Sequence, residues 1–226
     1  MDEDNELAET ALSTLEAIIR KCPLEVNDYI ADMVSRSFEL CAYDPNYQYN
    51  DDDDDEEMKD EEDDDGEGWG DEDFSDEGMP EDDDDTSWKV RRSAVAIIDA
   101  VIRTRPDKVK GIISQYADIL IDRIKERIDD VKVEILNTFQ GIIKASMEVK
   151  ESNMEMDLKA QTSVQRQLSM GEGLKAKQAL IVKVLSKPMK SKNMKVKVAA
   201  IDTISQYALL VGFNFDANFN EVWPEL

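Results

Sequence analysis

The sequence predicts an all-α fold, a HEAT/armadillo-type α-solenoid of about four stacked helical hairpins interrupted by a long disordered acidic insertion. Three observations support this prediction. An apolar pattern with helical spacing recurs four times along the 226 residues. No stretch alternates between apolar and polar residues for long enough to indicate a strand. Nearly all of the net charge lies in one short segment, and the rest of the chain is almost neutral.

The recurring pattern places apolar residues at offsets 0, 4, 5, 8, 11 and 12 from four starting points: Leu7, Val90, Val131 and Val196. At 100° per residue these offsets lie within an arc of roughly 140°, the apolar stripe of a core-facing helix. The copies start 83, 41 and 65 residues apart. The middle spacing is typical of a two-helix repeat of about 40 residues, and the longer ones predict two insertions. In three copies a cation follows the first apolar residue: Arg91, Lys132 and Lys197.

Each copy of the pattern is expected to be followed by a second helix. Apolar residues recur at three- and four-residue spacing over 26–41, after Pro23, and over 109–124, after Pro106. A third such helix is expected over 180–188, and a fourth is expected to begin at residue 215 and stop at 223–224. Proline is tolerated in the first turn of a helix and cannot continue one, which fits these boundaries.

These elements divide the chain into repeats and insertions. The predicted repeats cover 1–43, 87–128, 129–190 and 191–226, the last of them incomplete, with an acidic insertion at 44–86 and a polar insertion at 149–173 inside the third repeat. Because the last repeat is incomplete and neither end resembles a polar cap, we expect the sequence to be a slice of a longer solenoid.

The acidic insertion carries almost all of the net charge. Residues 51–85 hold 24 carboxylates and one lysine, a net charge of −23, whereas the whole chain has a net charge of −25. Such a run repels itself and cannot bury apolar area, which predicts disorder. The insertion could be a solvated spacer or an electrostatic lure for basic partners. An EF-hand-like spacing within it is expected by chance in so acidic a run.

The residue types exclude several functions. The absence of histidine excludes Ser-His-Asp and Cys-His catalysis and zinc sites that need imidazole. Cys22 and Cys41 are predicted to be buried thiols in a reducing compartment. We find no catalytic, cofactor or metal motif, so we expect no enzyme activity, no cofactor and no small-molecule substrate. No apolar run could span a bilayer, and the first residues are acidic; both predict a soluble intracellular protein without membrane partners. We expect it to be cytoplasmic and nuclear.

The candidate site is a surface for a protein partner. In stacked hairpins of this type the second helices line the concave face, which generally binds partners. Opposite their apolar stripes lie nine charged residues: Asp28, Asp32, Glu39, Asp118, Asp122, Lys125, Lys183, Lys187 and Lys190. The face is therefore expected to change from acidic to basic along the solenoid. The eight lysines of 175–197 lack interleaved arginines or aromatic residues, which favours an acidic protein surface over sequence-specific nucleic acid.

Several short strings in the chain are similar to one known family. The string RKCP at 20–23 ends the first predicted helix, YDPNY at 43–47 leads into the acidic insertion, SWKVRR at 87–92 follows it, and RIKER stands at 123–127. In this order around an acidic loop, they resemble an internal segment of the cullin-associated, neddylation-dissociated protein family. The resemblance is specific from about residue 20 to residue 132 and weaker from residue 149 onward.

The resemblance implies a long HEAT solenoid that wraps the cullin-RING ligase core, the cullin together with its RING subunit. It further implies binding to the unmodified cullin, occlusion of the lysine that accepts the ubiquitin-like modifier, and competition with the substrate-receptor module. Assembly, neddylation and receptor exchange would be regulated in this way. Two alternatives stay open, a karyopherin-like transport receptor for basic cargo and an acidic chaperone for basic proteins.

Overall fold

The described residues form helices and contain no strand. The computed structural model describes the backbone of residues 2–43, 86–152 and 171–212. It describes the side chains of residues 3–43, 86–147 and 171–212. The elements are α1 (Asp2–Lys21), η1 (Asn27–Tyr29), α2 (Ile30–Cys41), α3 (Ser87–Thr104), α4 (Pro106–Asp122), η2 (Arg123–Lys125), α5 (Asp129–Ser152), α7 (Gln178–Met189) and α8 (Met194–Val211). Residues 171–175 are also helical. Three predicted segments lie outside the described residues: nearly all of the acidic insertion, which was predicted to be disordered, most of the polar insertion, and the helix expected near residue 215.

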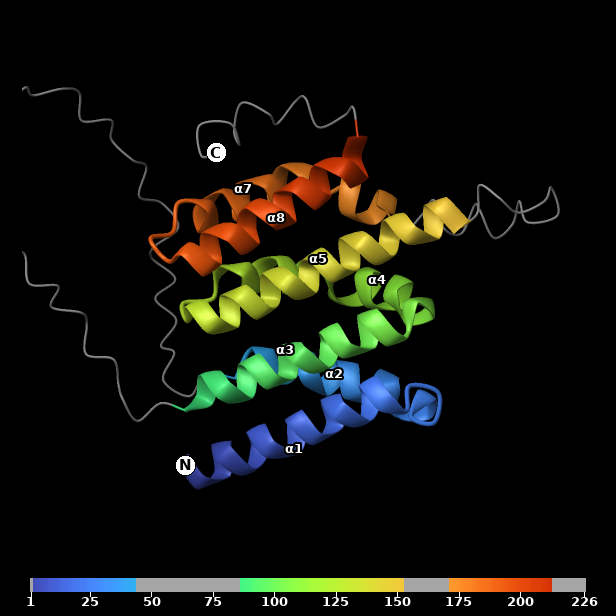
Figure 1. The fold of residues 1–226 in the computed structure, drawn as a ribbon, viewed down its shortest axis with the longest axis vertical. Coiled ribbons are helices and arrows are strands. Elements are labelled where there is room, and N and C mark those ends of the chain that lie inside the picture. The colour runs from blue at the N-terminus through green and yellow to red at the C-terminus, as the bar shows by residue number, and fades with distance from the viewer. Residues whose placement is uncertain (1, 44–85, 153–170, 213–226) are drawn as a thin grey trace, which may run out of the picture.

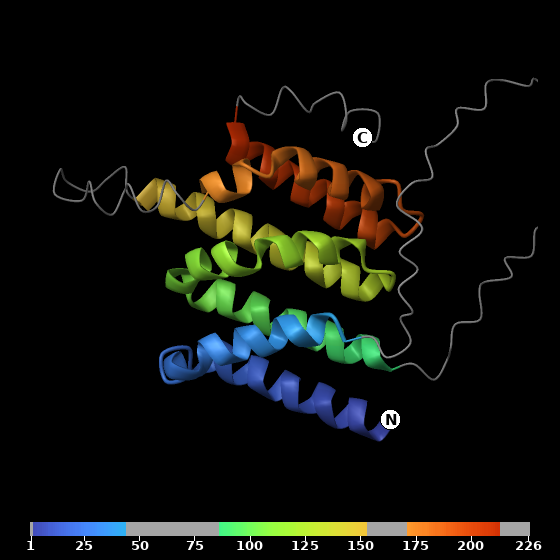
Figure 2. The ribbon, with the colours of Figure 1, turned by 180° about the vertical axis from the view of Figure 1, so that it is seen from behind.

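The helices stack in two layers, which confirms the predicted all-α solenoid of helical hairpins. In the first layer α1, α3, α5 and α8 lie side by side, each packed on the next (Figure 1). In the second layer α2, α4 and α7 cross behind them and face the viewer when the molecule is turned (Figure 2). The apolar stripes of the hairpins thereby face the space between the layers, as the repeat pattern requires.

Local chemistry sets several of the helix ends. Pro106 occupies the first turn of α4, where its missing N–H group costs no hydrogen bond. Asn193 caps α8, because its side-chain oxygen accepts a hydrogen bond of 3.0 Å from the backbone N–H of Lys195. Gly212, with φ of 68°, ends α8 in a conformation that other residues rarely adopt.

The stripes of the central helices are buried throughout. All six stripe residues of α3 and all six of α5 belong to the core, and Ile98 and Phe139 are each 0% exposed. The stripe of α1 is different, because Leu7 is 71% exposed and Ile18 is 40% exposed. Among the described residues, α3 and α5 have first-layer neighbours on both sides, whereas α1 packs on α3 alone in that layer. The difference in burial follows from this missing neighbour.

The two cysteines have different environments. Cys41 is 3% exposed, and burial raises the pKa of its thiol to about 12, so this thiol is unreactive at neutral pH. Cys22 is exposed. The prediction of two buried thiols is therefore wrong for Cys22, which follows the last residue of α1 and lies on the turn toward Pro23 rather than on an apolar stripe.

A buried ion-pair network, which we call the Arg91–Glu126 joint, links three segments of the chain. Arg91 Nε lies 3.3 Å from Glu126 Oε2, and these two side chains are 0% and 2% exposed. Arg91 Nη1 also donates to the carbonyl of Tyr43 at 3.0 Å and to the hydroxyl of Ser87 at 2.9 Å. Glu126 further pairs with Arg123 and accepts hydrogen bonds from the two backbone N–H groups just before α5. The joint thus fastens both ends of the acidic insertion to the turn after α4.

A second charged cluster lies between α1, α3 and α5. Asp99, whose side chain is 6% exposed, pairs with Arg20 at 3.1 Å and with Arg103 at 2.7 Å. The pKa of Glu134 on α5 is raised, first by burial and then by the negative charges of Asp99 and Glu16. The ionised form of Glu134 is therefore destabilised in the folded chain.

Glu134→Gln is expected to stabilise the fold at neutral pH. The unfolded carboxyl titrates near 4.5 and the folded one at a higher pH, so the charged side chain destabilises the fold above both values and not below them. The gain from the substitution should therefore be largest at pH 7 and shrink as the pH falls toward 4.5. Thermal midpoints followed by circular dichroism at several pH values test this. A gain that does not change with pH would contradict it, and the exposed Glu25→Gln serves as the control.

Candidate functional site

The candidate binding face is the outward side of the second layer. All nine predicted contact residues are exposed there or in the turns that follow its helices: Asp28 on η1, Asp32 and Glu39 on α2, Asp118 and Asp122 on α4, Lys125 on η2, Lys183 and Lys187 on α7, and Lys190 just after α7. The helical periodicity thus identified which side chains point away from the core. It did not show which of them lie together.

The acidic residues of this face are mostly engaged with neighbouring side chains. Glu39 pairs with Arg36 at 2.7 Å, and both side chains are more than half exposed, so this pair contributes little to stability. Asp118 pairs with Lys177, and Asp122 pairs with Lys125 at 3.3 Å. These contacts neutralise much of the negative charge on α4.

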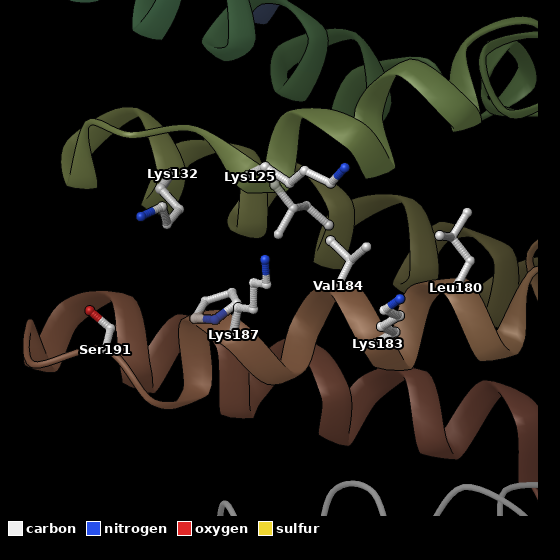
Figure 3. Close-up of a pocket in the computed structure, with 9 residues that line it drawn as sticks. Lys125, Lys132, Leu180, Lys183, Val184, Lys187 and Ser191 are labelled. Carbon is white, nitrogen blue, oxygen red and sulfur yellow. The ribbon is translucent and has the colours of Figure 1, made fainter. Parts of the chain in front are cut away.

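Three of the predicted lysines line a single groove, which we call the lysine groove. It has a volume of about 630 Å³ and lies between η2, the start of α5, and α7 (Figure 3). Its lining residues are Ile124, Lys125, Lys132, Leu180, Lys183, Val184, Lys187, Pro188 and Ser191. The lining therefore combines four lysines with an apolar floor and contains no acidic residue.

The charge of the lysine groove is not balanced within it. Lys125 and Lys132 pair with Asp122 at 3.3 Å and Asp129 at 3.4 Å. Lys187 extends from α7 into the groove, which Lys183 on the same helix also lines (Figure 3). In the described part of the chain no carboxylate lies within ion-pair distance of either of these two lysines. The α7 side of the groove thus carries two uncompensated positive charges.

The floor of the lysine groove offers apolar contact. Ile124 and Val184 are 1% and 8% exposed, and Pro188 is buried. Leu180 is 46% exposed and borders the groove rather than the core, although its place in the stripe of α7 predicted burial. An apolar floor beside unpaired cations suits a polypeptide segment that carries carboxylates together with an apolar side chain.

Of the nine residues that line the groove, the sequence prediction included Lys125, Lys183 and Lys187, and its main omission was Lys132. Lys132 belongs to a first-layer helix, whereas the prediction drew only on the second helices. The available signal was the cation that follows the first apolar residue of three copies of the pattern. The structure separates these cations, because Arg91 is buried in the joint, Lys132 lines the groove and Lys197 is partly buried on α8.

Two further classes of site are not seen in this part of the molecule. Within 2–43, 86–152 and 171–212, no group of three acidic, cysteine or histidine side chains could hold a metal ion. None of the helices in those ranges has the length and apolar character needed to cross a bilayer.

The chain is similar in sequence to several cullin-associated NEDD8-dissociated proteins. The chain is 34% identical over 206 residues to the mouse cullin-associated NEDD8-dissociated protein 2, a match that covers 91% of this chain and 16% of the mouse protein. It is 32% identical over 195 residues to cullin-associated NEDD8-dissociated protein 1 of Drosophila melanogaster, covering 86% of this chain and 15% of the relative. The corresponding Arabidopsis thaliana protein is 28% identical over 221 residues, covering 93% and 16%. No family model matches the chain.

The chain spans about one-sixth of the length of these relatives. The similarity nevertheless extends over nearly all of the chain, beyond the short strings of residues 20–132. The stacked helical hairpins agree with the resemblance that those strings suggested. The chain is therefore related to the cullin-associated NEDD8-dissociated protein family.

Proposed function

We propose that the chain is part of a non-catalytic scaffold that binds the cullin-RING ligase core in its unmodified state. The observation that carries this proposal is the similarity, over nine-tenths of the chain, to proteins named for association with cullins and dissociation from NEDD8. The stacked hairpins support it, because a solenoid presents a long, continuous surface to an extended partner.

The mechanism we propose is steric exclusion. A solenoid that embraces the cullin covers the surface around its acceptor lysine, and a modifier attached to that lysine would occupy the same space. The two states are then mutually exclusive, and the same competition would displace a substrate-receptor module. Regulation of ligase assembly, neddylation and receptor exchange would follow from this competition, without a chemical step on this chain.

The second-layer face is the surface that we propose for this contact, with the lysine groove at its basic end. The exposed Lys183 and Lys187 would meet carboxylates of the partner, while Val184 and Pro188 would add apolar contact. Because the chain covers only 15–16% of its relatives, it would supply only part of the complete interface. We therefore expect the affinity of this segment alone to be modest.

Binding should depend on the modification state of the cullin. The 226-residue chain is immobilised and titrated with a purified cullin-RING complex, with and without NEDD8 on the cullin, by biolayer interferometry. We expect about tenfold or greater preference for the unmodified complex, a difference of about 1.4 kcal/mol. Equal binding to both states, or binding to neither, would overturn the proposal. Release by a nucleotide-bound small GTPase would favour the transport-receptor alternative instead.

Charge reversal in the lysine groove tests the proposed face separately. Lys183→Glu with Lys187→Glu should weaken capture of the unmodified complex by about tenfold, because two attractions become repulsions. The matched control is Lys21→Glu with Lys144→Glu, which makes the same charge change at exposed positions of the first layer. If the two double variants behaved alike, the second-layer face would not be the contact surface, whatever the result with the modified cullin.

A further inference from the structure

The acidic insertion enters and leaves the fold beside the lysine groove. Tyr43 is the last described residue before the insertion, and Ser87 is the first residue of α3 after it. Arg91 binds the carbonyl of Tyr43 at 3.0 Å and the hydroxyl of Ser87 at 2.9 Å, and the same side chain pairs with Glu126 at 3.3 Å. Glu126 directly follows Lys125, which lines the groove. One buried arginine therefore ties the residues on both sides of the insertion to the turn that carries Lys125.

The insertion and the groove are opposite in charge. Residues 51–85 hold 24 carboxylates and one lysine, whereas the groove is lined by four lysines and no acid. Two of those cations, Lys183 and Lys187, have no carboxylate partner among the described residues. The insertion also contains two aromatic residues, Trp69 and Phe74, and the groove has an apolar floor that includes Val184.

The covalent connection favours the insertion over any free acidic ligand. Residues 44–85 comprise 42 residues, and half of that length reaches roughly 65–75 Å when extended. A tethered segment of this kind experiences an effective concentration of about a millimolar. Contacts between exposed charges are screened beyond about 8 Å at physiological salt and are individually weak. Tethering compensates for that weakness, whereas a free acidic ligand would have to compete at its own lower concentration.

We propose that the charged run of the acidic insertion, residues 51–85, binds the lysine groove of its own chain and occupies it until an acidic segment of a partner displaces it. The insertion then acts as an intramolecular competitor for the basic end of the second-layer face. The inference concerns the chain by itself and holds whether or not the partner is a cullin-RING complex. A salt-sensitive contact of this kind also keeps the groove from binding unrelated acidic proteins.

The first test is a zero-length cross-link in the unaltered chain. Carbodiimide coupling joins a lysine amine to a carboxylate in direct contact, and mass spectrometry identifies the pair. We expect cross-links from Lys183 and Lys187 to carboxylates of 51–85 that persist on dilution, because they form within one molecule, and that disappear in high salt. Cross-links between different chains only, or at lysines outside the groove only, would overturn the proposal.

The second test measures whether the groove is already occupied. A fluorescent peptide with the sequence of 51–85 is titrated by anisotropy onto the unaltered chain and onto a chain whose 24 carboxylates in that segment are changed to amides, which preserves its length. We expect the neutralised chain to bind the peptide about tenfold more tightly or better, since no tethered competitor remains. Equal affinity would show an open groove available to acidic segments of other molecules, and absence of binding to both would show no acidic site; either result overturns the proposal.

Charge reversal then locates the peptide on the neutralised chain. Lys183→Glu with Lys187→Glu should reduce the affinity about tenfold, whereas the control pair Lys21→Glu with Lys144→Glu should change it by less than about threefold. Both pairs change exposed side chains, and circular dichroism checks that the helices are retained. An equal loss in both pairs would indicate attraction by net charge alone and would overturn the assignment to the groove.

Discussion

Arg91→Met is expected to lower the free energy of unfolding by about 3 kcal/mol, since removing one partner of a buried ion pair leaves the other charge without full compensation. Arg91 is 0% exposed and holds Glu126, Tyr43 and Ser87 together. Glu126 keeps its contact with Arg123 and its backbone donors, which places the expected cost at the lower end of the usual range. Urea unfolding followed by circular dichroism measures the change.

The control for Arg91→Met is the same substitution in an exposed ion pair. Arg36 pairs with Glu39 at 2.7 Å, but the Arg36 side chain is 78% exposed, so Arg36→Met should cost less than about 1 kcal/mol. Combining Arg91→Met with Glu126→Gln should recover part of the loss, because the uncompensated buried charge is then removed. A cost for Arg91→Met no larger than that for Arg36→Met would show that the joint does not stabilise the fold.

Phe139→Ala is expected to destabilise the chain by about 3–5 kcal/mol, the usual cost of deleting a fully buried aromatic side chain. Phe139 is 0% exposed on α5, which packs on α3 at one side and on α8 at the other. A cavity at this position would weaken the stack in its centre. Since small proteins are stable by about 5–15 kcal/mol, the loss is a large fraction of the total.

The thermal midpoint and the urea midpoint of Phe139→Ala should both fall below those of the unaltered chain. Tyr29→Ala is the matched control, because Tyr29 is an aromatic residue of similar size that is 63% exposed. We expect Tyr29→Ala to change the free energy of unfolding by less than about 0.5 kcal/mol. Comparable losses for the two variants would mean that α5 is not the centre of the core.

The candidate site was predictable only in part. The helical stripe identifies the side opposite the core, and all nine charged residues chosen on that basis are exposed. The lysine groove, however, is built from η2 and the start of α5 on one side and from α7, much later in the sequence, on the other. Lys132 was missed because periodicity sorts residues within one helix and carries no information on which turn of another helix lies beside it.

The helices, their apolar stripes and the solenoid class could be determined from the sequence alone, because the period of 3.6 residues and the punctuation by Pro23 and Pro106 are local properties. The degree to which each apolar stripe is buried depends on how many helices pack beside it in the stack. The same pattern is fully buried in α5 but leaves Leu7 on α1 71% exposed, because α5 has a first-layer helix on each side and α1 has one among the described residues. Tertiary structure likewise placed Arg91 in the core, where Glu126 and the carbonyl of Tyr43 compensate its charge, and left Lys183 in an open groove. The sequence does not show whether a given cation is buried and paired or exposed and unpaired. The groups that the fold places around each cation decide whether that cation stabilises the chain or remains available to a partner.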